Sequence, residues 1–152
     1  MFAADVELPE RILGDARRSG VEPERIVIEI TETGAMADWE RAQGVLSDLR
    51  RHGFRLAIDD FGAGHSSLAR LGALPADTLK IDRSFVSGLP GNETSAMMVR
   101  AIIQLASNLG MEALAEGIET KEQLRFVVEA GCCRGQGFLF SQAVPGAAVA
   151  AL

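Results

Sequence analysis

The chain has 152 residues, of which 47% are hydrophobic and 24% are charged, and its formal net charge is −6. The hydrophobic content can build the core of one domain and argues against a disordered chain. The negative charge disfavours binding to DNA or RNA, which depends on many contacts from Lys and Arg to phosphates. The start of the chain lacks a signal-peptide pattern and its uncharged end is interrupted by polar residues, so we expect no membrane contact.

Short β-branched runs alternate with amphipathic segments, which predicts strands alternating with helices. Strands are predicted over residues 25–31, 54–59, 78–82, 111–115 and around 135–139. Helices are predicted over residues 9–18, 37–51, 66–71, 94–109 and 120–130, with a last short helix from residue 146. Glycines at 20, 53, 110 and 131 follow four of these helices, where the left-handed conformation open to glycine ends a helix. The order favours βαβ units and therefore an α/β fold with a parallel sheet.

Polar residues stand in or directly after the end of each predicted strand. They are Glu29, Glu32, Asp59, Asp60, Lys80, Asp82, Glu116, Glu119 and Gln136. In a parallel sheet these positions converge on one rim, the place where barrel enzymes hold their catalytic groups. Four carboxylates and a lysine on one rim suit two hard divalent cations, which can polarise a phosphodiester and lower the pKa of a water molecule.

Each of these residues, taken singly, also has a plain structural explanation. A lone Glu after a strand usually caps a helix or faces solvent, and Gln136 between two glycines would suit a turn. Lys80 faces away from its neighbours Leu79 and Ile81, as a lysine that reaches for solvent would. The adjacent aspartates Asp59 and Asp60 carry more weight, because neighbouring carboxylates repel each other unless a cation or a donor is present. Five such coincidences in sequence order favour a site.

Five motifs follow one another along the chain and span nearly all of it. They are Glu29-Ile-Thr-Glu32, Asp59-Asp-Phe-Gly-Ala-Gly-His-Ser-Ser-Leu68, Leu79-Lys-Ile-Asp82, Ala115-Glu-Gly-Ile-Glu119 and Gln136-Gly-Phe-Leu-Phe140. In sequence and in order they resemble the motifs of the EAL family of cyclic di-GMP phosphodiesterases. Two positions depart from the family pattern, since Ala63 replaces the usual Thr and His65 the usual Tyr; neither removes a metal ligand.

The resemblance implies a two-metal site that holds Mg²⁺ or Mn²⁺. Glu29 would ligate one ion, Asp59 would bridge both ions, and Asp60 and Glu116 would ligate the second. The implied reaction is hydrolysis of one phosphodiester bond of cyclic di-GMP, which gives the linear dinucleotide.

The resemblance also implies roles for the other polar residues. Lys80 would hold or activate the attacking water and Gln136 would support that water. Glu32 would anchor the loop that follows the second strand. Asp82 and Glu119 would contact the substrate.

Two of the family's metal-binding segments have no counterpart in this sequence. One is the early strand with the glutamate of the E-x-L motif, and the other is the strand with an asparagine ligand that precedes the first helix. Five β/α units also fall short of the ~250 residues that a complete eight-stranded barrel takes. We therefore expect residues 1–152 to form an EAL domain truncated at its N-terminus. Its fold would be a partial (β/α)8 TIM-type barrel of the later β/α units, weakly active or inactive alone.

Further expectations concern location and partners. Two adjacent cysteines with no disulfide or metal spacing fit a cytoplasmic protein. The exposed edges of the first and last strands, residues 25–31 and 135–139, predict a homo-oligomer. A sensor or cyclase domain is expected upstream in the full-length protein. The alternatives are a non-catalytic module that binds cyclic di-GMP or another protein, and an unrelated metal-dependent barrel enzyme.

Overall fold

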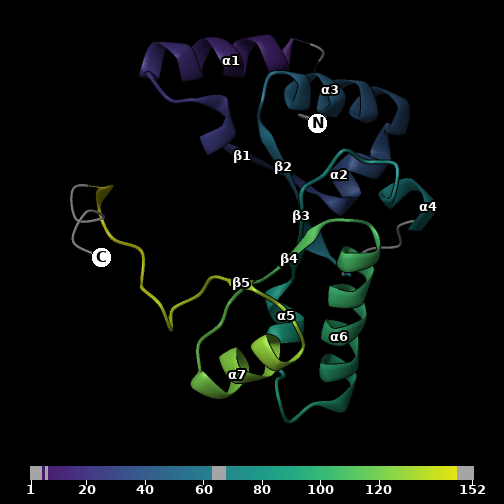
Figure 1. The fold of residues 1–152 in the computed structure, drawn as a ribbon, viewed down its shortest axis with the longest axis vertical. Helices are drawn as coiled ribbons and strands as arrows, with labels where there is room; N and C mark the ends of the chain where they lie inside the picture. Colours follow the sequence, from purple (N-terminus) through teal and green to yellow (C-terminus); the bar gives the residue numbers. More distant parts are fainter. Residues whose placement is uncertain (1–4, 6, 63–67, 147–152) are drawn as a thin grey trace.

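A five-stranded parallel sheet organises the molecule, with strand order β1-β2-β3-β4-β5 (Figure 1). The computed structural model describes residue 5, residues 7–62 and residues 68–146. The strands are β1 Val27–Thr31, β2 Arg55–Phe61, β3 Thr78–Ile81, β4 Glu112–Ala115 and β5 Arg134–Gly135. The helices are α1 Leu8–Ser19, η2 Pro23–Arg25, α2 Glu32–Ala37, α3 Trp39–Arg51, α4 Leu68–Leu71, α5 Arg83–Val86, α6 Glu93–Asn108 and α7 Lys121–Glu129. The predicted α/β class with a parallel sheet is confirmed.

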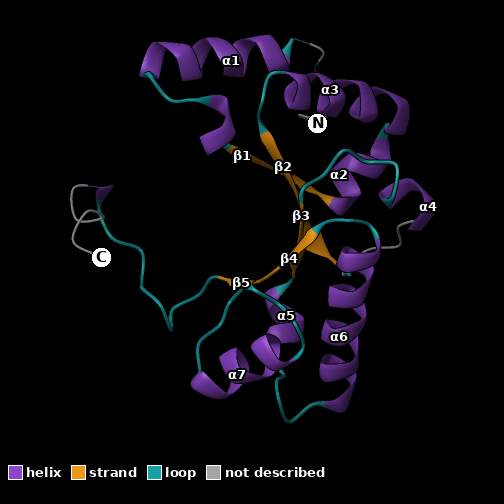
Figure 2. Cartoon of the chain, viewed as in Figure 1, coloured by secondary structure: helices purple, strands orange, loops and turns teal. Residues whose placement is uncertain are grey.

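The helices lie around the outside of the strands, with α1 and α3 toward one end of the view and α6 and α7 toward the other (Figure 2). Helix α3 packs against β2, and α6 contacts β3 and β4. Alternate residues of a strand face opposite sides of a sheet, so Leu79 and Ile81 belong to the buried hydrophobic core while Lys80 between them faces the other side. Among the described residues, no helix has the length and apolar character needed to span a membrane.

The predicted helix ends agree closely with the structure. The four glycines expected after helices, at 20, 53, 110 and 131, all have positive φ. Thr120 and Gln123 form the capping box that their spacing predicts at the start of α7. The helix predicted over 37–51 is α3, Trp39–Arg51, and Asp38 separates it from α2, Glu32–Ala37, which the sequence pattern did not predict.

The predicted strand around residues 135–139 is wrong in extent, because β5 contains only Arg134 and Gly135. Beyond it the Ile118 N–H donates to the Gln136 carbonyl at 3.0 Å, and the Leu139 N–H donates to the Ile118 carbonyl at 3.0 Å. These bonds draw the chain along the loop after β4 and into a turn. The helix predicted from residue 146 lies outside the described residues except for residue 146 itself. The first two residues of the helix predicted over 66–71 also lie outside them.

Candidate metal and catalytic site

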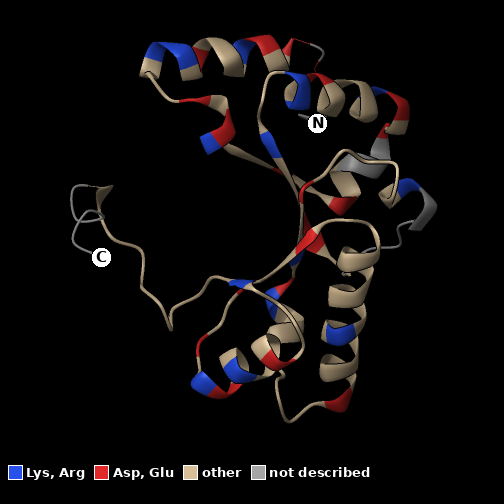
Figure 3. Cartoon of the chain, viewed as in Figure 1, with Lys and Arg blue, Asp and Glu red and all other residues tan. Residues whose placement is uncertain are grey.

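Acidic residues from three strands converge at the carboxyl end of the sheet. Glu29 lies in β1, Asp59 and Asp60 lie in β2, and Glu116 directly follows β4. Figure 3 shows acidic segments among the strands near the centre of the view. The sheet thus brings together residues that are up to 87 positions apart in sequence, from 29 to 116. The prediction that these carboxylates share one rim is in agreement with this arrangement.

A β-bulge in β2 places both aspartates on the same side. Ile58 pairs with Leu79 and Phe61 pairs with Ile81, so β2 advances three residues where β3 advances two. Asp59 and Asp60 therefore both stand opposite Lys80, and Asp60 adopts a positive φ of 54°. In a regular strand Asp60 would turn toward the helices and Phe61 toward the site. The bulge instead returns Phe61 to the core, where it is buried.

Lys80 is the cation of the site, and it is almost fully buried. Its Nζ lies 2.7 Å from Glu29 Oε2, 2.9 Å from Asp59 Oδ1 and 2.9 Å from Glu116 Oε1. Burial on its own would lower the pKa of Lys80, but its close contacts with these three carboxylates outweigh that effect and raise the pKa above its usual value. In the chain without a bound metal Lys80 is therefore an ammonium ion at physiological pH, a hydrogen-bond donor and a positive charge.

Three carboxylates lie close enough to share a cation. Asp59, Asp60 and Glu116 each offer an oxygen, and these oxygens lie within 4.8 Å of one another. Burial raises the pKa of Glu116. Burial, with the nearby charges of Asp59 and Asp82, also raises the pKa of Asp60. The crowded negative charge is therefore incompletely compensated by Lys80.

The oxygen atoms of this cluster fit a hard divalent cation. Asp59 Oδ1 is buried and lies at ion-pair distance from Lys80, yet within the described residues it has no hydrogen bond of suitable geometry. A buried carboxylate oxygen without a hydrogen bond is costly; the Lys80 ammonium ion offsets part of that cost here, and a bound cation would complete the surroundings of the oxygen. Carboxylate oxygens are the ligands that Mg²⁺ and Mn²⁺ prefer. Asp59, Asp60 and Glu116 are the residues that would hold such an ion, while Glu29 contacts Lys80 and lies outside this group of three.

Two further predicted residues support the cluster. The Gln136 side-chain amide donates to Glu116 Oε1 at 2.6 Å, so it orients a carboxylate of the cluster. The Gly62 N–H donates to Glu32 Oε2 at 3.2 Å, and Glu32 is buried. Glu32 therefore holds the residue that begins the loop after β2, although residues 63–67 of that loop lie outside the described part of the chain.

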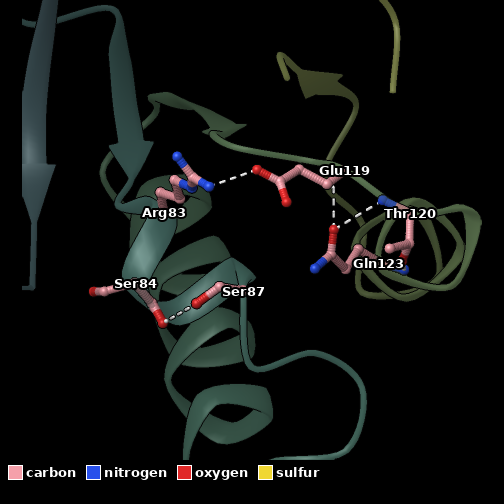
Figure 4. Close-up of polar contacts among 6 residues, drawn as sticks. All are labelled: Arg83, Ser84, Ser87, Glu119, Thr120 and Gln123. Carbon is pink, nitrogen blue, oxygen red and sulfur yellow. Dashed lines mark hydrogen bonds and ion pairs between the residues drawn. The ribbon is translucent and has the colours of Figure 1, made fainter. Parts of the chain in front are cut away.

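The two predicted substrate contacts, Asp82 and Glu119, lie beside the cluster. Asp82 caps α5, and hydrogen bonds from Ser84 hold the pKa of its carboxyl below the usual value. Glu119 lies after β4 and pairs with Arg83 at 2.5 Å (Figure 4). A surface pocket of about 510 Å³ is lined by Arg83, Glu119, Gln136, Phe138 and Gln142, among others. Sequence reasoning missed Arg83, because nothing in its spacing signals a partner 36 residues further along the chain.

Comparison with known proteins identifies the family. The model of the EAL domain matches residues 3–143. The chain belongs to the EAL domain family. The family match therefore covers most of the chain, in agreement with the resemblance of its motifs. The five β/α units follow the fold of solved EAL domains.

Relatives and solved structures agree with this assignment. The chain is 41% identical over 128 residues to the bifunctional diguanylate cyclase/cyclic di-GMP phosphodiesterase MucR of Pseudomonas aeruginosa, covering 84% of this chain and 19% of MucR. It superposes on the structure of the PaMucR phosphodiesterase in complex with c-di-GMP with a TM-score of 0.91, at 37% identity, covering 95% of this chain and 59% of that one. For Klebsiella pneumoniae BlrP1 in a manganese/cy-diGMP complex the TM-score is 0.84, at 33% identity, covering 91% and 35%. The chain spans about a fifth of the length of the curated relatives it matches.

The letters Glu-Ala-Leu occur in this EAL chain at residues 112–114, but they do not add a carboxylate to the site. Glu112 begins β4, at the opposite end of the strand from Glu116. Its side chain is exposed and pairs with Arg134 at 2.8 Å. Glu112 therefore belongs to the amino end of the sheet.

Proposed function

We propose that this chain carries part of a catalytic centre that hydrolyses one phosphodiester bond of cyclic di-GMP to the linear dinucleotide, with Mg²⁺ or Mn²⁺ as cofactor. The observation that carries the proposal is the contact of Lys80 with carboxylates from three strands, next to the group of Asp59, Asp60 and Glu116, in a chain of the EAL family. The c-di-GMP and manganese named for the solved relatives support the same substrate and cofactor.

The residues of the chain have distinct tasks in this proposal. Asp59, Asp60 and Glu116 hold the metal, with Glu29 as a further carboxylate on Lys80. A bound divalent cation supplies polarisation of the phosphodiester and a lowered pKa for the attacking water. Lys80, which stays protonated, holds that water or the negative phosphate oxygen through its ammonium protons. Gln136 keeps Glu116 in place and supports the water.

The substrate would lie over the carboxyl end of the sheet. Asp82 directly follows β3, Glu119 lies between β4 and α7, and these two residues are the proposed contacts of the nucleotide. Their carboxylates can accept hydrogen bonds from the N–H groups of a guanine base. Glu32 keeps the loop after β2 in position through Gly62.

The experiment is Mn²⁺ calorimetry and a hydrolysis assay on the purified chain. We expect Mn²⁺ binding that Asp59→Asn weakens and that Lys121→Met, a change at an exposed lysine, leaves unaltered. Hydrolysis by the chain alone should be slow, because residues 1–152 lack counterparts of two metal-binding segments of the family. Tight Mn²⁺ binding that ignores Asp59→Asn would refute the metal assignment.

The hydrolysis assay separates the remaining readings. Rapid metal-dependent turnover lost in Lys80→Ala would show that the two further segments are dispensable. Cyclic di-GMP binding without any turnover, even when the upstream reading frame supplies the E-x-L and asparagine strands, would instead favour a non-catalytic binding module.

We further propose that the chain is a cytoplasmic homo-oligomer within a longer, multidomain protein. In the described sheet β1 pairs with β2 alone, and Val27 on it is 49% exposed. Unpaired strand edges with apolar residues readily pair with a second chain. Both cysteines are free thiols, which suits a reducing compartment. Light scattering at micromolar concentration tests the assembly: a dimer or larger species is expected, Val27→Lys should weaken it, and a stable monomer would contradict it.

A further inference from the structure

An arginine outside the carboxylate cluster contacts the loop that follows Glu116. Arg83 is the first residue of α5, directly after β3 and Asp82. Its Nη2 lies 2.5 Å from Glu119 Oε1, in the loop between β4 and α7 (Figure 4). Arg83 thus links the segments that leave two neighbouring strands, one strand carrying Lys80 and the other preceding Glu116.

The aliphatic part of Arg83 also covers the loop that it pairs with. Gly117 has φ +67°, and a Cβ added there would lie 2.4 Å from Arg83 Cγ. The arginine stem therefore lies directly on the backbone next to Glu116. Only glycine leaves room for this approach, and only glycine adopts that φ readily.

The segment from Glu116 to Glu119 is held on its other sides by backbone and capping bonds. The Glu116 N–H donates to the Ile81 carbonyl at 3.2 Å, and the Ile118 N–H donates to the Gln136 carbonyl at 3.0 Å. The N–H of Glu119 donates to Oε1 of the buried Gln123 at 2.8 Å (Figure 4). Lys80 in β3 contacts the Glu116 carboxylate itself, and Arg83 adds a second side-chain tie, from the start of α5 to Glu119 at the other end of this segment.

We propose that Arg83 is a positioning residue that sets where the Glu116 carboxylate stands relative to Lys80 and the two aspartates. The expected effect on metal binding rests on the proposed metal-dependent function. The position of the Glu116 carboxylate does not, because it can be measured in the chain without metal. An ion pair whose side chains are 61% and 41% exposed contributes little to stability. Its role is geometric, because a metal site fails when its supporting residues let a ligand move by about 1 Å.

The chain offers a matched control at the other end of the same strand. Arg50 on α3 pairs at 2.5 Å with Asp77, which precedes β3, and their side chains are 48% and 31% exposed. Both pairs therefore join a helix to a segment flanking a strand, with the same distance and similar exposure. Arg50→Met removes an equivalent ion pair far from Glu116.

The experiment compares Arg83→Met with Arg50→Met in the full chain by Mn²⁺ calorimetry. Methionine retains a long apolar side chain over Gly117 and removes the guanidinium. We expect Arg83→Met to weaken Mn²⁺ binding about tenfold, as loss of a residue that orients a ligand does, and Arg50→Met to leave it unchanged. The charge-reversed double variant Arg83→Glu/Glu119→Arg should recover most of the affinity. Unchanged Mn²⁺ binding in Arg83→Met would overturn the proposal.

A second readout needs no metal. The NMR signal of the Glu116 side-chain carboxyl carbon in the metal-free chain should move in Arg83→Met, stay in Arg50→Met, and return in the double variant. If the parent chain binds no Mn²⁺, the proposed function fails and this signal alone decides the positioning role. A Glu116 signal indifferent to Arg83→Met, or equally disturbed by Arg50→Met, would overturn the inference in either case.

Discussion

The two ends of the parallel sheet treat charge in opposite ways. At the amino end the two carboxylates Asp77 and Glu112 have partners: Asp77 accepts from Arg50 and from the Leu56 N–H, and Glu112 pairs with Arg134. At the carboxyl end four carboxylates gather around one buried lysine. Paired charges need no further counter-ion. An incompletely compensated acidic cluster raises the free energy of the metal-free protein and therefore favours a bound cation. The contrast separates the part of the sheet where carboxylates are paired from the part that we propose to bind the metal.

The largest loss of stability is expected for Lys80→Met, a change at the carboxyl end of the sheet. The change leaves three carboxylates of the site without their shared ammonium ion. We expect the free energy of unfolding in EDTA to fall by about 3 kcal/mol, the lower end for a broken buried pair because Glu29 is half exposed. Urea unfolding monitored by circular dichroism measures the loss.

The same experiment with Mg²⁺ sharpens the test. If Lys80 supplies positive charge that the carboxylate cluster needs, millimolar Mg²⁺ should increase the stability of Lys80→Met more than that of the parent chain. Lys121→Met, the same change at an exposed lysine, should have little effect in either buffer. A loss of stability that Mg²⁺ does not reduce would indicate a packing defect in place of an electrostatic one.

A smaller effect is expected for two glycines that share a backbone conformation. Gly20 at the end of α1 has φ +66° with open space around it, and Gly117 has φ +67° beneath Arg83. Gly20→Ala should cost about 1–2 kcal/mol, the strain of a left-handed alanine. Gly117→Ala should cost about 1–3 kcal/mol more, because the Arg83 stem has to move. Equal losses in thermal unfolding for the two variants would show that Arg83 does not press on Gly117.

The smallest expected effects differ in sign between the two ends of the sheet. Asp77→Asn weakens two hydrogen bonds and should lower the free energy of unfolding by about 1 kcal/mol, a modest value because the side chain is 31% exposed. Asp59→Asn removes one of the crowded charges and should raise the metal-free stability, by less than about 0.5 kcal/mol. Denaturant titrations in EDTA measure both. If Asp59→Asn lowered the free energy of unfolding as much as Asp77→Asn, the negative charge at the carboxyl end would already be compensated.

Much of the fold was predictable because its signals are local. β-branched runs, glycines after helices and the Thr120–Gln123 capping box each depend on neighbours within one turn of a helix or one strand. The rim of polar residues was predictable because parallel strands bring their carboxyl ends together, so Glu29, Asp59 and Glu116 converge from order alone.

What could not be predicted depends on contacts between distant segments. The strand near residue 135 ends early because the backbone of Ile118 captures the chain beyond it. The partnership of Arg83 and Glu119 arises only when β3 and β4 lie side by side. Periodicity also gave no sign of α5, whose four residues complete a single turn.

The bulge in β2 makes the site depend on the number of residues in the strand as well as on their identities. Asp59 and Asp60 together lie opposite the single residue Lys80, so the strand needs two residues between Ile58 and Phe61. A substitution at either aspartate changes one proposed metal ligand and leaves the register intact. Deleting either residue would close the bulge, leaving one aspartate opposite Lys80 with Phe61 still paired to Ile81. Length variation, tolerated in most connecting segments of an α/β protein, is therefore forbidden at this point of β2.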